Sequence, residues 1–485
     1  MGSATLRGDP EGLSAPVCRA RTRSGDVAVT AVGSIPTGVH TAPARPESVG
    51  WKPRTRIAFR FCFLYFGLYC LLIPPNLFTL TGWFGRWVGY DAQYWPIRKM
   101  QPALDGVSRY LFGTGAQLYP TGVGDQTIFW VLLLCILVVA IAGTTVWSVL
   151  DRRRRQYRTL AGWYLLGLRL VLAGQLLSFG VVKAIPTQMP QPSLTALLTD
   201  YGDFTPMAVL WSQVGVSRPY EMLLGAAEIT AAILLLVPRT ALLGALLAVI
   251  DTLQIVVLNM TFDVPEKMSS THLLLMALIL LAPEARRLMH MLVLDRSTGS
   301  STAPYPFHTN RSRRIAASAQ AVLGIWIAMA LVYGGWHAWS ARGPDRPEPP
   351  LYGIWSVSQY IRDGRPVPPL TTDETRWKTL VFDFPNIITY QRMDDTLVTV
   401  PAEVDATAHR IRLTADGPRS GPAAEPGVTR NPLGTLDFRQ LTPAGVVLTG
   451  DLDGHQVTLT LERIDPNGFP QRNTPFHWVQ NRPNL

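Results

Sequence analysis

Between residues 57 and 336, long apolar segments alternate with short polar or basic ones. A segment of about 17–25 mostly apolar residues is long enough to cross the hydrocarbon layer of a bilayer. The pattern therefore predicts an all-α transmembrane helix bundle of about seven spans. The expected spans are Ile57–Ile73, Ile128–Leu150, Gly162–Val182, Tyr220–Val237, Thr240–Leu258, Thr271–Ala282 and Ile315–Trp336.

The sixth of these segments is the weakest, because Thr271–Ala282 supplies only about twelve residues before Pro283. Proline interrupts the hydrogen bonds of a helix, so we expect a helix that begins near Lys267 and is kinked at Pro283. The arginine-rich segment Glu284–Arg314 supports a crossing at this point, because it should lie on the same side as the other basic segments.

After the proline-rich segment Gly343–Pro350 the apolar period changes to two, which is typical of half-buried strands. Eight such segments, several joined by turn pairs such as Asp363-Gly364 and Asp453-Gly454, predict an all-β antiparallel barrel or sandwich. A barrel of this size has room for one small apolar ligand. The expected strands are Ile354–Ile361, Lys378–Phe384, Ile387–Met393, Leu397–Val404, His409–Thr414, Gly434–Gln440, Val446–Leu452 and His455–Arg463.

The loops carry further expectations. The aromatic loop Pro74–Asp125 is expected to lie on the bilayer, with an amphipathic helix at Tyr94–Phe112. The loop Lys183–Arg218 is expected to contain a short helix at Ser193–Tyr201, and Pro418–Pro426 should be a mobile loop of the β domain.

Composition divides the chain into five expected parts. They are a disordered segment at 1–50, two spans with an aromatic extracytoplasmic loop at 51–160, a four-helix membrane domain at 161–294, a basic cytoplasmic loop and the seventh span at 295–342, and an extracytoplasmic β domain at 343–485.

The formal net charge of +10 is concentrated beside the apolar segments, at Lys52–Arg60, Arg152–Arg158 and Arg286–Arg314. Membrane loops rich in lysine and arginine stay in the cytoplasm. With an odd number of spans, the N-terminus is expected in the cytoplasm and the β domain outside it. A basic excess placed in this way orients a membrane protein, so the lipid bilayer is the expected partner and nucleic acid is not.

Several chemical signatures are missing from the sequence. There is no glycine-rich nucleotide loop, no HExxH and no GxSxG, so nucleotide use and zinc hydrolysis have no support. The cysteines form no CxxC pair, which argues against a metal site or a disulfide framework. They are Cys18, Cys62, Cys70 and Cys135.

Ionisable side chains interrupt the apolar segments between Trp163 and Leu281. A charge within a membrane bundle costs at least a few kcal/mol, so these side chains should face one another or a polar cavity. They are the candidates for function: Arg169, Lys183, Glu221, Glu228, Asp251 and His272.

The sequence alone allows more than one pairing among these side chains. Glu221 and Glu228 are seven residues apart, on one helix face, where two carboxylates can relay protons or bind a cation. In the alternative, Glu221 is interfacial and Glu228 pairs with Arg169 or Lys183. We expect Arg169 to contact Glu228 or Asp251. A lysine at the end of a span more often reaches for the headgroups, which is the simpler interpretation of Lys183.

Two other side chains have similar alternatives. His272 is either a group that titrates near neutral pH or a structural hydrogen-bond partner, and the second is commoner. Gln175 lies on a face similar to that of Arg169 and is a further candidate for binding.

Short motifs in Trp163–Leu281 resemble the four-helix membrane domain of the DoxX family, over about residues 160–282. They are Leu-Arg-Leu-Val-Leu-Ala-Gly (168–174), Phe-Gly-Val-Val-Lys (179–183), Glu-Ile-Thr-Ala-Ala (228–232) and Leu-Leu-Val-Pro-Arg-Thr-Ala (235–241). The resemblance implies a bacterial cytoplasmic membrane protein with links to quinone or thiol redox chemistry. The missing cysteine pairs argue against a thiol-handling role. The matching positions are Arg169, Phe179, Lys183, Glu228, Pro238 and Arg239.

The β domain has a resemblance of its own. Leu-Tyr-Gly-Ile-Trp at 351–355 is similar to the Gly-x-Trp start of lipocalin-type barrels, in which the tryptophan closes one end of the barrel. The alternative is a β-sandwich with an exposed tryptophan.

The sequence thus leads to two functional hypotheses. The first is quinone-linked redox or electron transfer, or an accessory role in it, with Arg169, Lys183, Glu228 and Asp251 as candidate catalytic residues. Glu221, Gln175 and His272 are then candidates for binding a quinone, the one cofactor suggested, and no metal site is expected. The second is a non-enzymatic membrane protein that binds or handles a lipid or another small molecule.

Overall fold

A computed structural model describes residues 50–299, 301, 303–343, 346–414 and 432–473. The chain divides into two units, Met1–Gly50 and Trp51–Leu485. The predicted disordered segment at 1–50, apart from Gly50, and the predicted loop Pro418–Pro426 lie outside the described residues.

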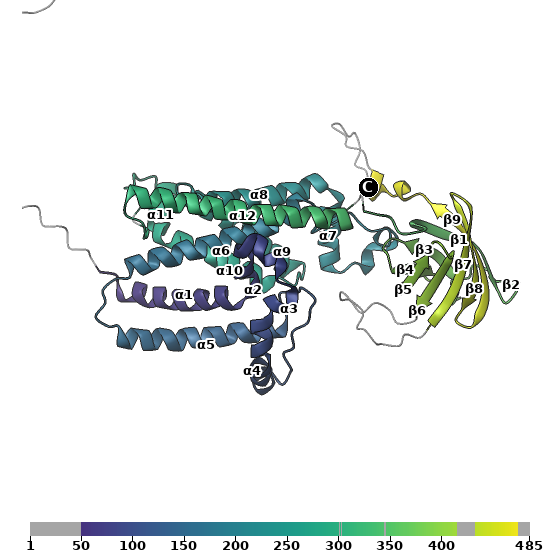
Figure 1. Ribbon diagram of the computed structural model, residues 1–485, viewed down its shortest axis with the longest axis horizontal. Helices are drawn as coiled ribbons and strands as arrows, with labels where there is room; N and C mark the ends of the chain where they lie inside the picture. Colours follow the sequence, from purple (N-terminus) through teal and green to yellow (C-terminus); the bar gives the residue numbers. More distant parts are fainter. Residues whose placement is uncertain (1–49, 300, 302, 344–345, 415–431, 474–485) are drawn as a thin grey trace, which may run out of the picture. The chain divides into compact units, whose positions relative to one another are not determined.

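Seven helices in the described residues are long and apolar enough to cross a membrane, which confirms the predicted bundle (Figure 1). They are α1 (Pro53–Leu72), α5 (Thr127–Leu150), α6 (Arg158–Ala184), α8 (Arg218–Leu236), α9 (Ala241–Thr261), Lys267–Leu292, and α12 (Asn310–Arg342).

The sixth span is longer than the apolar segment that predicted it. It begins at Lys267, as expected, with α10 (Lys267–Leu281). One 3-10 turn at Ala282–Glu284 contains Pro283, and α11 (Ala285–Leu292) continues the apolar segment beyond it. The proline therefore changes the helix locally but does not end the span.

Short helices fill the loops between the spans. The predicted amphipathic helix is confirmed as α4 (Trp95–Phe112), whereas the helix expected at Ser193–Tyr201 is replaced by two 3-10 turns. A further helix in the same loop, α7, was not predicted. These short elements are α2 (Pro74–Thr81), η1 (Gly82–Trp87), α3 (Tyr90–Gln93), η2 (Ala196–Leu198), η3 (Tyr201–Asp203) and α7 (Pro206–Val216).

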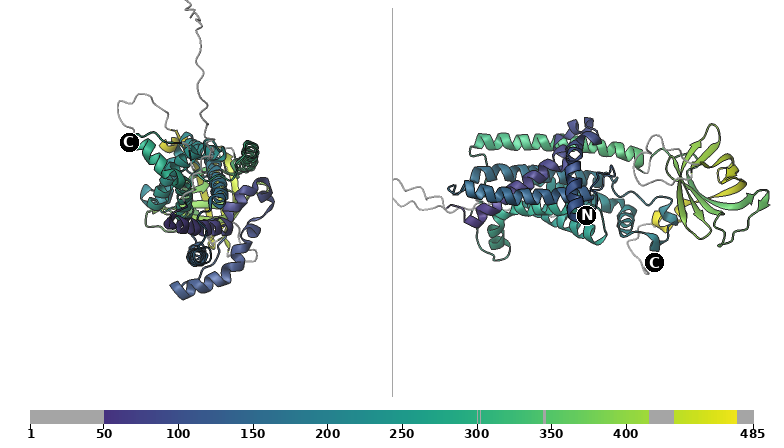
Figure 2. Two further views of the ribbon diagram at one scale, coloured as in Figure 1. Left: turned by 90° about the vertical axis from the view of Figure 1, so that its left-hand side faces the viewer. Right: turned by 90° about the horizontal axis from the view of Figure 1, so that it is seen from below.

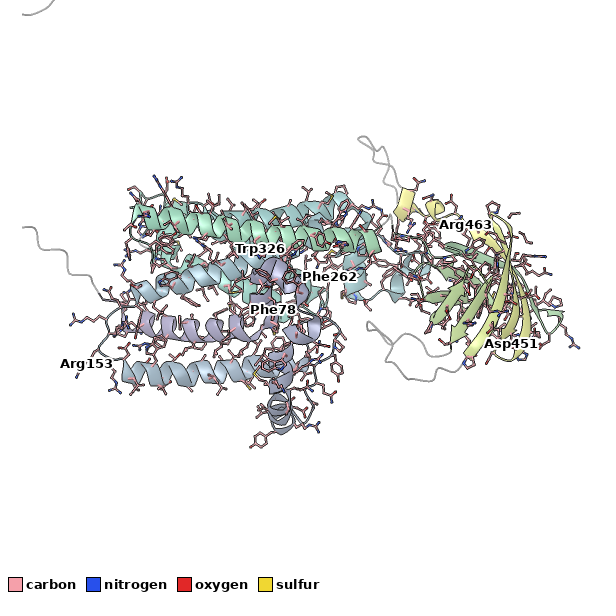
Figure 3. The ribbon with its side chains drawn as sticks, in the orientation of Figure 1. Phe78, Arg153, Phe262, Trp326, Asp451 and Arg463 are labelled. Carbon is pink, nitrogen blue, oxygen red and sulfur yellow. The ribbon has the colours of Figure 1, made fainter. Side chains whose placement is uncertain are left out.

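Helix α6 packs against α8, α10, α12 and α2, so it occupies the middle of the helical region. Figure 2 shows α12 running alongside the other long helices. Trp326 on α12 (Figure 3) donates its Nε1 hydrogen to the carbonyl of Thr81 at 2.9 Å and so ties α12 to the end of α2.

Two glycines allow α6 and α8 to approach closely. A Cβ on Gly180 would lie 2.9 Å from the carbonyl oxygen of Gly225, and a Cβ on Gly225 would overlap the backbone nitrogen of Ala184. Small residues at a helix contact allow the backbones of membrane helices to come together. This contact brings the last turn of α6 beside the middle of α8, where the charged candidates lie.

The C-terminal domain is a closed antiparallel barrel of eight strands, which decides between the predicted barrel and sandwich (Figure 1). Strand β1 pairs with both β3 and β9, and the closing register sets Ile354 opposite Ile464. All eight predicted strands are confirmed. They are β1 (Gly353–Arg362), β3 (Trp377–Phe382), β4 (Ile387–Arg392), β5 (Leu397–Asp405), β6 (Arg410–Thr414), β7 (Pro432–Thr442), β8 (Gly445–Leu452) and β9 (His455–Ile464), with the two-residue β2 (Arg365–Pro366) added to β1.

The turn chemistry fixes two of the hairpins. Asp363 and Gly364 both have positive φ, 49° and 75°, and Asp453 and Gly454 have 54° and 79°. Two positive φ values in a two-residue loop favour the type I′ turn, whose twist matches that of the strands. Asp-Gly at these positions therefore sets the register of β1–β2 and β8–β9.

Trp355 is buried in the core of the barrel, with 2% of its surface exposed. Its Nε1 donates to the carbonyl of Leu351 at 2.8 Å, so the indole N–H has a partner. The alternative of an exposed tryptophan is thus wrong.

Arg376 is buried in the same domain and donates to the carbonyls of Val367 and Val357.

Candidate functional site

An ion pair lies between α6 and α8 within the membrane-spanning part. The Nζ of Lys183 is 2.6 Å from Oε1 of Glu228, and the two side chains are 9% and 2% exposed. The expectation that Lys183 reaches for the headgroups is therefore wrong, and the alternative pairing of Glu228 with Lys183 is confirmed. The second carboxylate oxygen of Glu228 has no hydrogen-bond partner in the described residues.

Asp251 on α9 is close enough to Lys183 and Glu228 to interact with both electrostatically. Its Oδ2 is buried, and no described residue forms a hydrogen bond with it. The same lysine also acts on Glu221, two turns before Glu228 on α8. Lys183 thus forms an ion pair with Glu228 and also attracts the carboxylates of Asp251 and Glu221.

The predicted contact of Arg169 with Glu228 or Asp251 is wrong. Arg169 and Lys183 are fourteen residues apart, about 21 Å along a helix, so one carboxylate does not reach both. Arg169 instead donates a hydrogen bond to Oε1 of Gln320 on α12, and none of the ion pairs among the described residues includes it. Gln320 is not predictable as the partner of Arg169, because it lies 151 residues away and nothing in the local sequence marks it.

Gln175 and His272 are held by separate contacts. Gln175 donates to the carbonyl of Pro75 at 2.8 Å and so holds α2 against α6. His272 bonds to the hydroxyl of Tyr65 at 2.9 Å and stacks on the ring of Tyr69 with centroids 4.2 Å apart. These contacts favour the structural interpretation of His272.

Glu221 is fully buried within the protein, in the first turn of α8. Its Oε1 accepts a hydrogen bond from the backbone N–H of Met189 at 2.9 Å, and its Oε2 has no partner. A loop residue that is 32 positions away therefore buries this carboxylate, and no sequence pattern signals such a contact.

Glu221 also lines a cavity of about 700 Å³. The cavity lies where the end of α6, the start of α8 and the end of α12 meet, and the linker before β1 and the residues after β3 complete it. Its walls contain the aromatic side chains Phe204, Trp211, Trp339, Tyr352 and Phe384. Its charged residues are Arg218, Arg342, Arg346, Arg472, Glu221, Glu348 and Asp383.

The arginines of the cavity are partly engaged. Arg218 donates to Oε1 of Gln191 at 2.8 Å and lies over the ring of Trp339. Arg346 pairs with Asp383. Arg472 donates to the carbonyl of Pro192, but its buried Nε has no partner.

Local sequence explains why the loop forms the wall of this cavity. Thr205 caps α7 by accepting from the backbone N–H of Ala208, and Pro206 follows at the first helical position. Gly215 lets the carbonyl of Pro190 approach α7 so closely that a Cβ there would overlap it. The backbone N–H of Leu194 donates to Asp383 at 2.7 Å, which joins the loop to the end of β3.

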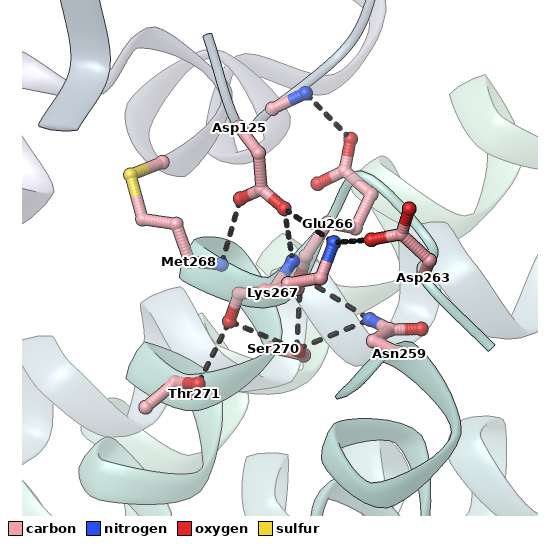
Figure 4. A network of polar contacts seen from close by, with 9 residues as sticks. Asp125, Asn259, Asp263, Glu266, Lys267, Met268, Ser270 and Thr271 are labelled. Atoms are coloured by element: carbon pink, nitrogen blue, oxygen red, sulfur yellow. Dashed lines mark hydrogen bonds and ion pairs between the residues drawn. The ribbon is translucent and has the colours of Figure 1, made fainter. Parts of the chain in front are cut away.

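A second polar cluster stabilises the start of the sixth span (Figure 4). Asp125 accepts from the backbone N–H groups of Lys267 and Met268 at 2.8 and 2.9 Å, and Glu266 accepts from Gly124 at 3.0 Å. Burial raises the pKa of Glu266 above its ordinary value. Asp125 caps the start of α10 although it lies 142 residues earlier in the chain. Because it satisfies backbone N–H groups that would otherwise have no partner, we assign the cluster a structural role.

Comparison with known proteins gives one curated relative. Over 121 residues the chain is 36% identical to the uncharacterized protein YwoB of Bacillus subtilis (strain 168), and the match covers 25% of this chain and 77% of that protein. No family model and no solved structure matches the chain. At that identity and coverage, the chain belongs to the same family as YwoB.

Proposed function

We propose that this multi-pass membrane protein binds a small amphiphilic molecule in the cavity above α6, α8 and α12, and handles it without chemical conversion. The observation that carries the proposal is the cavity itself. Its volume of about 700 Å³ lies within the range of about 300–1,000 Å³ that is usual for ligand pockets. Aromatic walls with a few charged groups are also typical of such sites.

The position of the cavity suits a molecule that comes from the bilayer. Pro186 follows α6, Arg218 begins α8 and Trp339 lies in the last turn of α12, so the ends of three spans meet at its wall. Tryptophan and tyrosine rings favour the membrane–water boundary. An amphiphile can place its polar part in the cavity and its apolar part beside the spans.

Filling the cavity tests this proposal. Ala208 lines the cavity, and Ala208→Trp should displace a bound molecule by occupying its space. Native mass spectrometry of the purified full chain should show one molecule bound to the wild type and a loss of most of it in the variant. Ala226→Trp, on an exposed position of α8, is the control and should bind as the wild type does. Equal occupancy in all three proteins would contradict the proposal.

A quinone-linked redox role is the second candidate, and the Lys183–Glu228 pair is the observation that favours it. Ionisable groups inside a membrane bundle often belong to proton pathways. Glu228→Gln keeps the shape of the side chain and removes its charge, so it should weaken quinone binding to purified protein. Glu403→Gln, on an exposed part of β5, is the control. If neither the wild type nor Glu228→Gln binds quinone, this role should be abandoned.

The two resemblances are also proposals. We infer a DoxX-like four-helix domain in α6, α8, α9 and α10, which pack on one another in sequence. We infer a lipocalin-like barrel in the β domain, supported by the buried Trp355. Neither assignment supplies the function, which depends on the residues of this chain.

The sidedness of the membrane domain is a further proposal. Backbone contacts set Trp51 beside Arg155, and Gly162 lies against Pro306, so three basic segments lie at one end of the bundle. We infer that this end is cytoplasmic and that the β domain is outside.

Cysteine labelling tests the sidedness. Ser358 is exposed on β1, and Ser358→Cys in an otherwise cysteine-free chain should react with a membrane-impermeant reagent in intact cells. A cysteine in the basic segment, Arg153→Cys, should react only after lysis. The reverse pattern would place the β domain in the cytoplasm.

A further inference from the structure

The cavity brings opposite charges together at a single place. Four arginines and three acidic residues line it, and just one pair, Arg346–Asp383, is a direct ion pair between them. A simple anion would meet the buried carboxylate of Glu221, and a simple cation would meet the arginines. The lining therefore suits a ligand that carries both signs of charge.

Glu221 marks where the positive part of such a ligand would bind. Its Oε1 accepts from Met189, whereas its Oε2 is buried and has no hydrogen-bond partner among the residues that the structure describes. A buried acceptor without a donor is unfavourable, so a donor from a ligand would stabilise the complex. Lys183, which also acts on Glu221 electrostatically, donates its hydrogen bond to Glu228.

Arg218 and Arg472 mark where the negative part of the ligand would bind. Within the described part of the chain, Arg218 makes one hydrogen bond, to Gln191, and its guanidinium lies over the ring of Trp339. The Nε of Arg472 is buried and has no partner among the residues described. Guanidinium groups bind phosphate oxygens in a fixed, often bidentate geometry.

We propose that the ligand is a headgroup in which a phosphate is linked to a primary amine, as in phosphoethanolamine. The phosphate binds Arg218 and Arg472, and the ammonium donates to Oε2 of Glu221. The assignment rests on the proposed function and names its ligand class. Two sources share this chemistry, an ethanolamine phospholipid of the bilayer and soluble phosphoethanolamine.

The test uses the full chain, purified and delipidated in detergent. The probes are dioleoyl phosphatidylethanolamine, phosphatidylglycerol and phosphatidylcholine with the same acyl chains, and free phosphoethanolamine. The glycerol lipid lacks the amine, and the choline lipid has a cation without an N–H donor. Native mass spectrometry measures the affinity of each probe.

The wild type should bind the ethanolamine lipid about tenfold or more tightly than the other two lipids, because a hydrogen bond to a charged group is at stake. Glu221→Gln should remove this preference and leave binding of the glycerol lipid unchanged or tighter. Arg218→Gln should weaken both lipids, since both carry the phosphate. Arg410→Gln, on an exposed pair of the β domain, is the control and should change nothing.

Failure of the inference is distinguishable from failure of the proposed function. If the three lipids bind equally to the wild type, or if Glu221→Gln folds and keeps the preference, the amine is not recognised and the headgroup assignment is overturned while the cavity remains a binding site. If no probe binds and no molecule copurifies, both the headgroup assignment and the proposed function are overturned. Free phosphoethanolamine that binds as tightly as the lipid supports the headgroup chemistry and assigns it to a soluble source.

Discussion

Replacing Lys183 with methionine should lower the free energy of unfolding by about 3–5 kcal/mol, because it leaves buried carboxylates without their cation. Glu228 is nearly fully buried, and Asp251 and Glu221 also depend on the charge of Lys183. The loss should exceed that of any exposed ion pair. Unfolding in mixed micelles, followed by tryptophan fluorescence, measures it.

A matched pair controls for the size of the substitution. Lys378 pairs with Asp395, and the two side chains are 44% and 50% exposed, so Lys378→Met should cost about 0–1 kcal/mol. The double variant Lys183→Met/Glu228→Met should recover part of the loss, because it removes one buried carboxylate together with the cation. Small and equal losses for Lys183→Met and Lys378→Met would show that the Lys183–Glu228 pair is not buried.

Trp355→Ala should destabilise the β domain by about 3–5 kcal/mol, the usual cost of removing a large buried aromatic side chain. Its ring belongs to the core of the barrel, and its indole N–H is bonded to Leu351. The change removes both the packing and the hydrogen bond at the start of β1.

Amide hydrogen exchange locates this effect. Exchange should accelerate in β1, β3 and β9, which Trp355 helps to hold together, and should stay unchanged in the long helices. Leu441→Ala, at an exposed position of β7, is the control and should have little effect. If both variants exchange alike, Trp355 does not stabilise the barrel.

The spans and strands were predictable because their periods are local. The strands β8 and β9 are joined by Asp453-Gly454, so neighbouring residues determine both the alternation of apolar and polar positions and the turn. The choice between a barrel and a sandwich was not predictable. It depends on the pairing of Ile354 with Ile464, which are 110 residues apart.

The site was predictable in its residue types and not in its partners. A lysine and a glutamate inside apolar segments indicate a buried polar centre, and Lys183 and Glu228 are indeed paired. Which cation meets which carboxylate depends on the level of each residue in the bundle, so Arg169 was misassigned and its partner Gln320 was missed. The cavity depends on a loop that folds back onto Glu221, and periodicity does not describe such loops.

Photocrosslinking tests the central claim, a specific molecule in the cavity, most directly. The photoreactive residue benzoylphenylalanine is placed at Met207, which lines the cavity, and separately at Val322, which is exposed on α12. After irradiation in native membranes, mass spectrometry identifies the adducts. A single species enriched at Met207 and absent from the bulk-lipid mixture at Val322 is the expected result. The same lipid mixture at both positions, or no adduct at Met207, would contradict the account.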